Sequence, residues 1–108
     1  MVKAGSLKKR YIAFELKGPE MDEKTLKYAI YAEALKFFGE YGLSEAALKL
    51  VEYNASTKKG ILRCEREYLE KVLGFLALVS SLNNEEARLV SIKSSGTIHS
   101  LEPMLSTQ

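Results

Sequence analysis

The spacing of the apolar residues constrains the fold of this chain more strongly than any other feature of its sequence. In residues 10–17, RYIAFELK, every second residue is apolar, and this period of two predicts a β-strand. Asp22 is the expected N-cap, and from there apolar residues recur at steps of three and four as far as Gly42. This second segment predicts a helix of about five turns that ends near Gly42.

Apolar residues alternate between the same two periods in the rest of the chain. The expected elements are a strand at 46–53, a polar turn at 54–60, a strand at 61–65, a helix at 66–82, a strand at 87–93 and a turn at 94–100. The two strands that flank the polar turn predict a hairpin. The last residues, EPMLSTQ, predict a loose tail.

The order of these elements, β-α-β-β-α-β, is that of the ferredoxin-like α+β sandwich, in which two helices cover one face of a four-stranded antiparallel sheet. The 108 residues suit a single domain, with an ordered core at about 8–99 and a loose tail at 100–108. Strand alternation directs five residues toward the helices: Ile12, Phe14, Leu16, Leu62 and Cys64. The opposite face, which we expect to stay open, carries Tyr11, Ala13, Arg63 and Glu65.

A membrane or secreted protein is not expected. No apolar run approaches the roughly 20 residues that span a bilayer, and residues 1–11 lack the apolar core of a signal peptide. Cys64 is the one cysteine, so no internal disulfide can form, which favours a reducing compartment. We therefore expect a cytoplasmic protein with no membrane partner.

The sequence contains no evident catalytic site. His99 is the single histidine, and no group of His, Cys, Asp and Glu has the spacing of a metal site. The glycines match neither common nucleotide-binding motif. Cys64 lies in an apolar strand, where a thiol usually acts as a small hydrophobic residue. We therefore expect no catalytic residue, no bound metal and no cofactor held by the protein.

The cations are unevenly distributed, although a net charge of +2 is too small by itself to indicate a nucleic-acid partner. They gather before the first strand and around the polar turn of the hairpin, and they are Lys8, Lys9, Arg10, Lys58, Lys59 and Arg63. Such clusters either contact the phosphates of RNA or form ordinary solvated surface.

Three features of these regions leave two interpretations open. Arg63 either pairs with an acid such as Glu65 or Glu15, or it is available for a phosphate group. Tyr11 either stacks on a base or packs on the sheet. Residues 94–98, SSGTI, either approach a phosphate through a glycine and hydroxyl groups, or form a simple turn.

Read together, three blocks of this sequence resemble the ribonuclease P protein component 2 family. The blocks are KKRYIAFEL near the start, KKGILRC in the middle and SSGTI near the end, and the resemblance covers about residues 8–99. This family is the archaeal counterpart of a small subunit shared by eukaryotic ribonuclease P and ribonuclease MRP. Its fold is ferredoxin-like, in agreement with the interpretation of the pattern.

The resemblance implies an accessory subunit of the ribonucleoprotein that removes the 5′ leader from precursor tRNA. In that enzyme the RNA performs metal-assisted hydrolysis, so Mg²⁺ is expected at the RNA active site. The implied partners are the ribonuclease P RNA, a subunit of TIM-barrel type in two copies with two copies of this chain, other ribonuclease P proteins and, indirectly, precursor tRNA. The partner contact would use the open sheet face or a helix flank.

The resemblance also extends to individual positions. The family's opening Arg-Tyr falls on Arg10 and Tyr11, its Gly-Arg-Cys strand on Gly60, Arg63 and Cys64, and its Gly-Thr-Ile on Gly96, Thr97 and Ile98. His99 stands where the family often has a basic residue. The expected RNA-binding residues are Lys8, Lys9, Arg10, Tyr11, Lys58, Lys59, Arg63, Ser95, Gly96, Thr97 and His99. The alternative is a homo-oligomeric ferredoxin-like module that binds a ligand or a protein without RNA.

Overall fold

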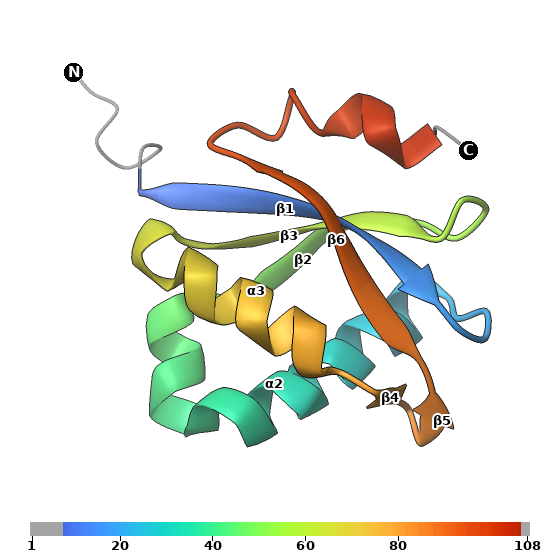
Figure 1. The fold of residues 1–108 in the computed structure, drawn as a ribbon, viewed down its shortest axis with the longest axis horizontal. Helices are drawn as coiled ribbons and strands as arrows, with labels where there is room; N and C mark the ends of the chain where they lie inside the picture. The colour runs from blue at the N-terminus through green and yellow to red at the C-terminus, as the bar shows by residue number, and fades with distance from the viewer. Residues whose placement is uncertain (1–7, 107–108) are drawn as a thin grey trace.

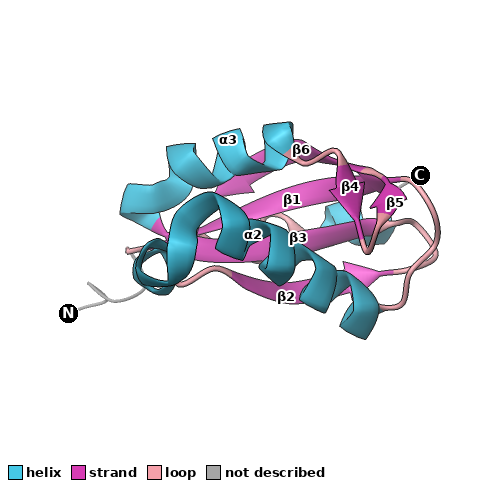
Figure 2. Cartoon of the chain, turned by 90° about the horizontal axis from the view of Figure 1, so that it is seen from below, coloured by secondary structure: helices cyan, strands magenta, loops and turns pink. Residues whose placement is uncertain are grey.

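The computed structural model describes residues 8–106, and four strands form one antiparallel sheet in the order β2-β3-β1-β6. These strands are β1 (Lys9–Lys17), β2 (Lys49–Asn54), β3 (Lys59–Glu65) and β6 (Arg88–Ser95). Two helices, α2 (Glu23–Ala46) and α3 (Leu69–Leu78), lie against one face of this sheet (Figures 1 and 2). The predicted ferredoxin-like α+β arrangement is therefore confirmed.

Helix α2 begins as predicted but ends later than predicted. Asp22 caps it, because its carboxylate accepts a hydrogen bond from the backbone N–H of Thr25 at 2.8 Å. The helical conformation is interrupted at Gly39, where φ is 77°, and resumes through Gly42 as far as Ala46. Burial of Ala46 favours this extension, and the left-handed Ala47 that follows ends the helix. The expectation of a helix end near Gly42, with a strand from residue 46, was therefore wrong.

The second helix is shorter than the expected range 66–82. A 3₁₀ turn, η1 (Arg66–Tyr68), precedes α3, and a short hairpin of β4 (Ser81–Leu82) and β5 (Glu85–Glu86) follows it. The hairpin turns at Asn83 and Asn84, both of which have positive φ. Asparagine tolerates this conformation better than most residues, so the pair favours a tight turn here.

The main core lies between the sheet and the two helices. The residues predicted to face the helices are all in it, namely Ile12, Phe14, Leu16, Leu62 and Cys64. They pack with residues of both helices such as Leu26, Ile30 and Val72, which are fully buried. This part of the strand alternation was predicted correctly.

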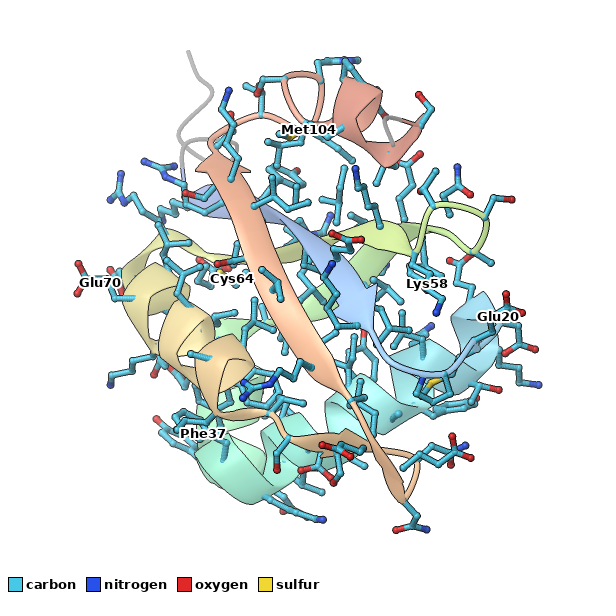
Figure 3. The ribbon with its side chains drawn as sticks, turned by 45° about the vertical axis from the view of Figure 1, so that its right-hand side comes forward. Glu20, Phe37, Lys58, Cys64, Glu70 and Met104 are labelled. Carbon is cyan, nitrogen blue, oxygen red and sulfur yellow. The ribbon has the colours of Figure 1, made fainter. Side chains whose placement is uncertain are left out.

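A second, smaller core covers the centre of the opposite sheet face. Leu101 and Leu105, the latter within the 3₁₀ helix η2 (Glu102–Ser106), are buried against Ala13 and Ile61. Figure 1 shows this segment above the sheet, with the helices below it, and Figure 3 shows Met104 and Phe37 on opposite sides of the strands.

The expectations of an open sheet face and a loose tail at 100–108 were therefore wrong for residues 101–106. Two leucines four residues apart can cover the small side chain of Ala13, and their burial holds the segment in place. Residues 107 and 108 lie outside the described part of the chain. No helix within residues 8–106 is both long and apolar enough to cross a membrane.

Candidate nucleic-acid interface

The register of the sheet divides the expected RNA-binding residues between two ends. Tyr11 of β1 lies opposite Arg63 of β3 and opposite Ser95 of β6. Lys59 lies opposite Glu15, four residues further along β1. Four residues of a strand span about 13 Å, so Lys58 and Lys59 are at the far end of the sheet from the other residues.

A row of four side chains crosses the sheet at the first end. Cross-strand partners project to the same face, and here the partners follow one another through all four strands. In sheet order the row consists of Lys49, Arg63, Tyr11 and Ser95. It borders the C-terminal segment, against which Tyr11 is partly packed.

Lys49 is the member of this row that the sequence did not indicate. The register of the β2–β3 hairpin shifts by one residue between Leu50 and Glu52, and this irregularity places Lys49 opposite Arg63. A regular hairpin would have placed Lys49 opposite Cys64, on the helix side of the sheet. A β-bulge has no reliable signature in a single sequence, so no signal could have identified Lys49.

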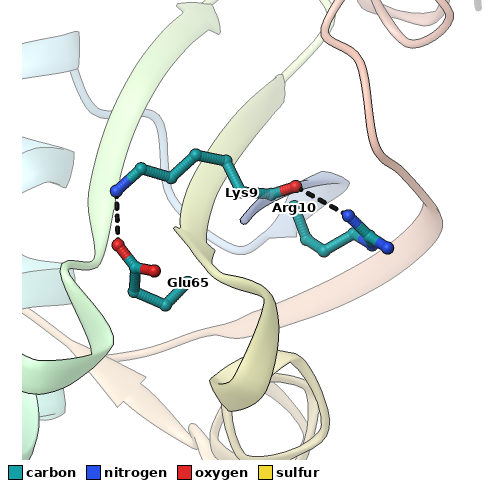
Figure 4. A network of polar contacts seen from close by, with 3 residues as sticks. All are labelled: Lys9, Arg10 and Glu65. Atoms are coloured by element: carbon teal, nitrogen blue, oxygen red, sulfur yellow. Dashed lines mark hydrogen bonds and ion pairs between the residues drawn. The ribbon is translucent and has the colours of Figure 1, made fainter. Parts of the chain in front are cut away.

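Arg63 is not paired with either of the acids considered for it. Glu65 forms an ion pair with Lys9 at 2.5 Å (Figure 4), and Glu15 forms one with Lys17 at 3.5 Å. The Nε atom of Arg63 is buried, and no atom of residues 8–106 hydrogen-bonds to it. The ion-pair interpretation is therefore excluded for these two acids, and Arg63 lies on the sheet face without a carboxylate partner in the described chain.

Lys8, Lys9 and Arg10 begin β1 and have different surroundings. Lys8 is exposed, whereas Lys9 is held by Glu65. Arg10 donates a hydrogen bond from Nη1 to the carbonyl of Lys9 at 2.9 Å, and its side chain points away from Glu65 (Figure 4). A Cβ atom at Gly96 would be 3.5 Å from Nη1 of Arg10, so the guanidinium group lies against this glycine.

The turn at residues 95–100 is closed by its own hydroxyl groups. Ser100 Oγ lies 2.6 Å from Ser95 Oγ and 3.0 Å from Thr97 Oγ1, and the N–H of Thr97 donates to Ser95 Oγ. His99 is 90% exposed, with Nδ1 3.5 Å from a carboxylate oxygen of Glu102. These contacts account for a stable turn without a ligand.

The two lysines of the hairpin turn, Lys58 and Lys59, lie at the second end of the sheet and contact other parts of the protein. Lys58, which has a φ of 61°, donates from Nζ to the carbonyl of Gly18 at 2.6 Å and so joins two turns. Figure 3 shows Lys58 well separated from Cys64. Lys59 is half-buried opposite Glu15.

The chemistry of Cys64 is that of a core residue. The side chain is fully buried, and burial raises the pKa of its thiol to about 11. The thiol is therefore neutral at pH 7 and is a poor nucleophile. Within residues 8–106 no group of three or more His, Cys, Asp and Glu side chains could hold a metal ion.

An apolar groove runs between α2 and α3 on the helix side of the molecule. Phe37 and Leu78 are 45% and 69% exposed, and Phe37 packs on Phe75 with ring centroids 5.6 Å apart. The groove has a volume of about 260 Å³, and its lining includes Glu33 and Lys36. Exposed apolar residues of this size mark a surface suited to a protein contact.

The sequence pattern of the Rpp14/Pop5 family matches residues 10–105, which include both cores and the row across the sheet. The chain belongs to the Rpp14/Pop5 family. Among its relatives, ribonuclease P protein component 2 of Pyrococcus furiosus is 35% identical over 96 residues, which are 88% of this chain and 80% of the relative.

Two further relatives carry the same name. Ribonuclease P protein component 2 of Pyrococcus abyssi is 34% identical over 102 residues, with 94% of this chain and 86% of the relative covered. That of Methanocaldococcus jannaschii is 35% identical over 92 residues, with 84% and 67% covered. The expected family membership is therefore confirmed.

Proposed function

We propose that this chain is a protein subunit of ribonuclease P that binds and stabilises the RNA of the enzyme, and that this RNA removes the 5′ leader from precursor tRNA. Its relatives are named as ribonuclease P protein components. The observation that carries RNA binding is Arg63 in the row across the sheet, which has no acidic partner within residues 8–106, because a cation of this kind suits a phosphate group.

In this proposal the protein makes no bond-breaking contribution. The buried Cys64 and the exposed His99, held near Glu102, supply no nucleophile–base pair. Mg²⁺ then belongs to the RNA, which performs the hydrolysis. The protein lowers the repulsion between RNA phosphates and so reduces the Mg²⁺ concentration that cleavage requires.

The partner protein in this proposal is a ribonuclease P subunit of TIM-barrel type, in two copies with two copies of this chain. The C-terminal segment covers the centre of the second sheet face, so of the two expected surfaces we assign the contact to the helix flank. The groove beside Phe37 and Leu78 is the apolar surface that supports this assignment. Other ribonuclease P proteins and precursor tRNA would be reached through the assembled RNA, in the cytoplasm.

The test is reconstitution of precursor-tRNA cleavage from the RNA, the partner subunit and this chain. We expect the mixture to cleave at a lower Mg²⁺ concentration than the RNA alone. Cleavage by the purified chain without RNA would contradict the proposal, as would an unchanged Mg²⁺ requirement. A homo-oligomeric module without RNA is the alternative, and it predicts no salt-dependent affinity for this RNA in a gel-shift assay.

A further inference from the structure

Two cations lie directly opposite each other on the sheet face, at the start of β2 and near the end of β3. Arg63 and Lys49 are Cα partners in the antiparallel β2–β3 ladder. Partners of this kind have Cβ atoms about 4.5–5.5 Å apart, so their side chains leave the sheet together. Lys49 is exposed, whereas Arg63 is half-buried.

This pair has no neutralising group in the described chain. Of the two acids closest in the register, Glu65 pairs with Lys9. The other, Glu52, lies opposite Ile61 and makes no ion pair within residues 8–106, and burial raises its pKa, which favours the neutral carboxyl group. Neither Arg63 nor Lys49 makes a side-chain ion pair or hydrogen bond within residues 8–106, and the buried Nε of Arg63 is without an acceptor. Like charges directly opposite each other destabilise a sheet, and a buried donor without an acceptor adds to this cost.

An anion between the two side chains would remove the repulsion between the two cations. The planar guanidinium group of Arg63 can donate two parallel hydrogen bonds to a phosphate, and Lys49 can add a third donor from the other side. The row continues with Tyr11 and with the hydroxyl-bearing Ser95. A polyanionic ligand can therefore extend along this row across the strands.

The surroundings favour a phosphate of RNA over a carboxylate of a protein. The row of Lys49, Arg63, Tyr11 and Ser95 contains no exposed aliphatic side chain, whereas the core of a protein interface needs apolar contact. The apolar groove that suits a protein lies on the other side of the molecule, beside Phe37.

We propose that Arg63 and Lys49 form a clamp for one phosphodiester group of RNA, with Lys49 as a binding residue that the sequence pattern does not reveal. This inference rests on the proposed function, because it names the contact that the RNA would make at the same site. The bulge in β2 is the structural feature that creates the clamp, since it brings Lys49 to the face of Arg63.

The first test measures the binding of the assembled protein pair to ribonuclease P RNA over a range of salt concentrations. The variants are Lys49→Gln, Arg63→Gln and the double variant, and the matched control is Lys24→Gln, which removes an exposed cation of α2. We expect each single variant to weaken binding about tenfold and to reduce the slope of log affinity against log salt by about 0.7–0.9. The double variant should lose little more than the larger single effect, because both cations bind one phosphate.

The second test needs neither RNA nor the partner subunit. It can therefore contradict the proposal even if a variant assembles poorly with the partner. In the free protein, Lys49→Gln should raise the melting temperature by about 1–5 °C, because it removes the like-charge contact. Added sodium chloride should stabilise the wild-type protein more than the Lys49→Gln protein, because salt screens the repulsion only where it exists.

The possible outcomes separate this inference from the proposed function. If the wild-type protein shows no salt-dependent RNA affinity, the proposed function fails and the clamp fails with it. If the wild type binds RNA but Lys49→Gln and Arg63→Gln behave like Lys24→Gln, the clamp is wrong and the function stands. Loss of partner-protein binding without RNA, in either clamp variant, would assign the pair to a protein contact and overturn the proposal.

Discussion

The hydroxyl group of Thr57 donates a hydrogen bond to the backbone carbonyl of Leu105, 48 positions further along the chain. This contact joins the β2–β3 turn to η2 and fixes one end of the segment that covers the sheet. The cover is therefore held by a polar contact at its edge and by two buried leucines on its underside.

Replacement of Leu101 by alanine should destabilise the protein by about 2–4 kcal/mol, because it leaves a cavity in the small second core. Chemical denaturation measures this change. Leu35→Ala is the matched control on α2, where the side chain is 43% exposed, and it should cost well under half as much. Equal effects of the two substitutions would mean that the cover does not contribute to folding stability.

The folding stability of the protein should depend on pH through Glu52. Burial, followed by the nearby carboxylates of Glu102 and Glu23, raises the pKa of Glu52 above its ordinary value. The folded state therefore favours the protonated form, so the stabilising contribution is complete below the unfolded-state pKa and is lost as pH rises through the raised folded-state pKa.

Glu52→Gln should consequently raise the free energy of unfolding at pH 7 and leave it nearly unchanged at low pH. Denaturation curves between pH 4 and pH 8, compared with those of the exposed-site control Glu45→Gln, measure the difference. A Glu52→Gln protein that is less stable than the wild type at pH 7 would contradict this prediction.

Cys64 should behave as a structural residue. With its pKa raised to about 11 by burial, the thiol should not react with a disulfide reagent at pH 8 until the protein unfolds. Cys64→Ser should cost about 1–3 kcal/mol, because a hydroxyl group would be buried in the main core, while RNA binding should persist in the folded protein. Rapid labelling of the native protein would show that the thiol is accessible.

Substitution by alanine should change the folding stability in opposite directions at two glycines. A Cβ atom at Gly60 would be 2.7 Å from the carbonyl oxygen of Glu52 and 2.8 Å from the ring of Phe14, so Gly60→Ala should destabilise the protein by more than about 2 kcal/mol. A Cβ atom at Gly74, within α3, would meet no atom within 4 Å, so Gly74→Ala should stabilise it by up to about 1 kcal/mol. Thermal unfolding distinguishes these results, and effects of the same sign would contradict the packing argument.

The partner contact assigned to the helix flank can be tested by a charge in the apolar groove. Phe37→Glu should weaken binding of the TIM-barrel-type subunit at least tenfold, because it places a carboxylate in an apolar contact. Calorimetric titration without RNA measures the affinity. Val90→Glu on β6 is a control of similar exposure, 43% against 45%, and an equal loss for both variants would remove the groove from consideration.

The sequence predicted the sheet, both helices and the inward positions of the main core, because those features follow from local periods of hydrophobicity. It did not predict that residues 101–106 cover the sheet, since Leu101 and Leu105 alone are too few to show a period. The extension of α2 to Ala46 was missed because Gly42 resembles a stop signal, whereas burial of Ala46 outweighs it.

For the candidate site, the sequence predicted which residues lie on each strand but not how the strands pair. Arg63 and Tyr11 were identified from their strands, and the structure places them opposite each other. Their separation from Lys58 depends on the register of the whole sheet, which local patterns do not contain. The position of Lys49 depends on a bulge, and a shift of one residue reverses the face of the sheet on which a side chain lies.

The late position of Leu101 and Leu105 in the sequence has a consequence for synthesis on the ribosome. Strand β1 emerges first, yet Ala13 can be shielded from water only after these two leucines have left the exit tunnel. During that interval the nascent polypeptide exposes this strip of β1 to solvent. A released chain truncated before residue 101 should therefore be recognised by chaperones, although it contains every strand of the main sheet.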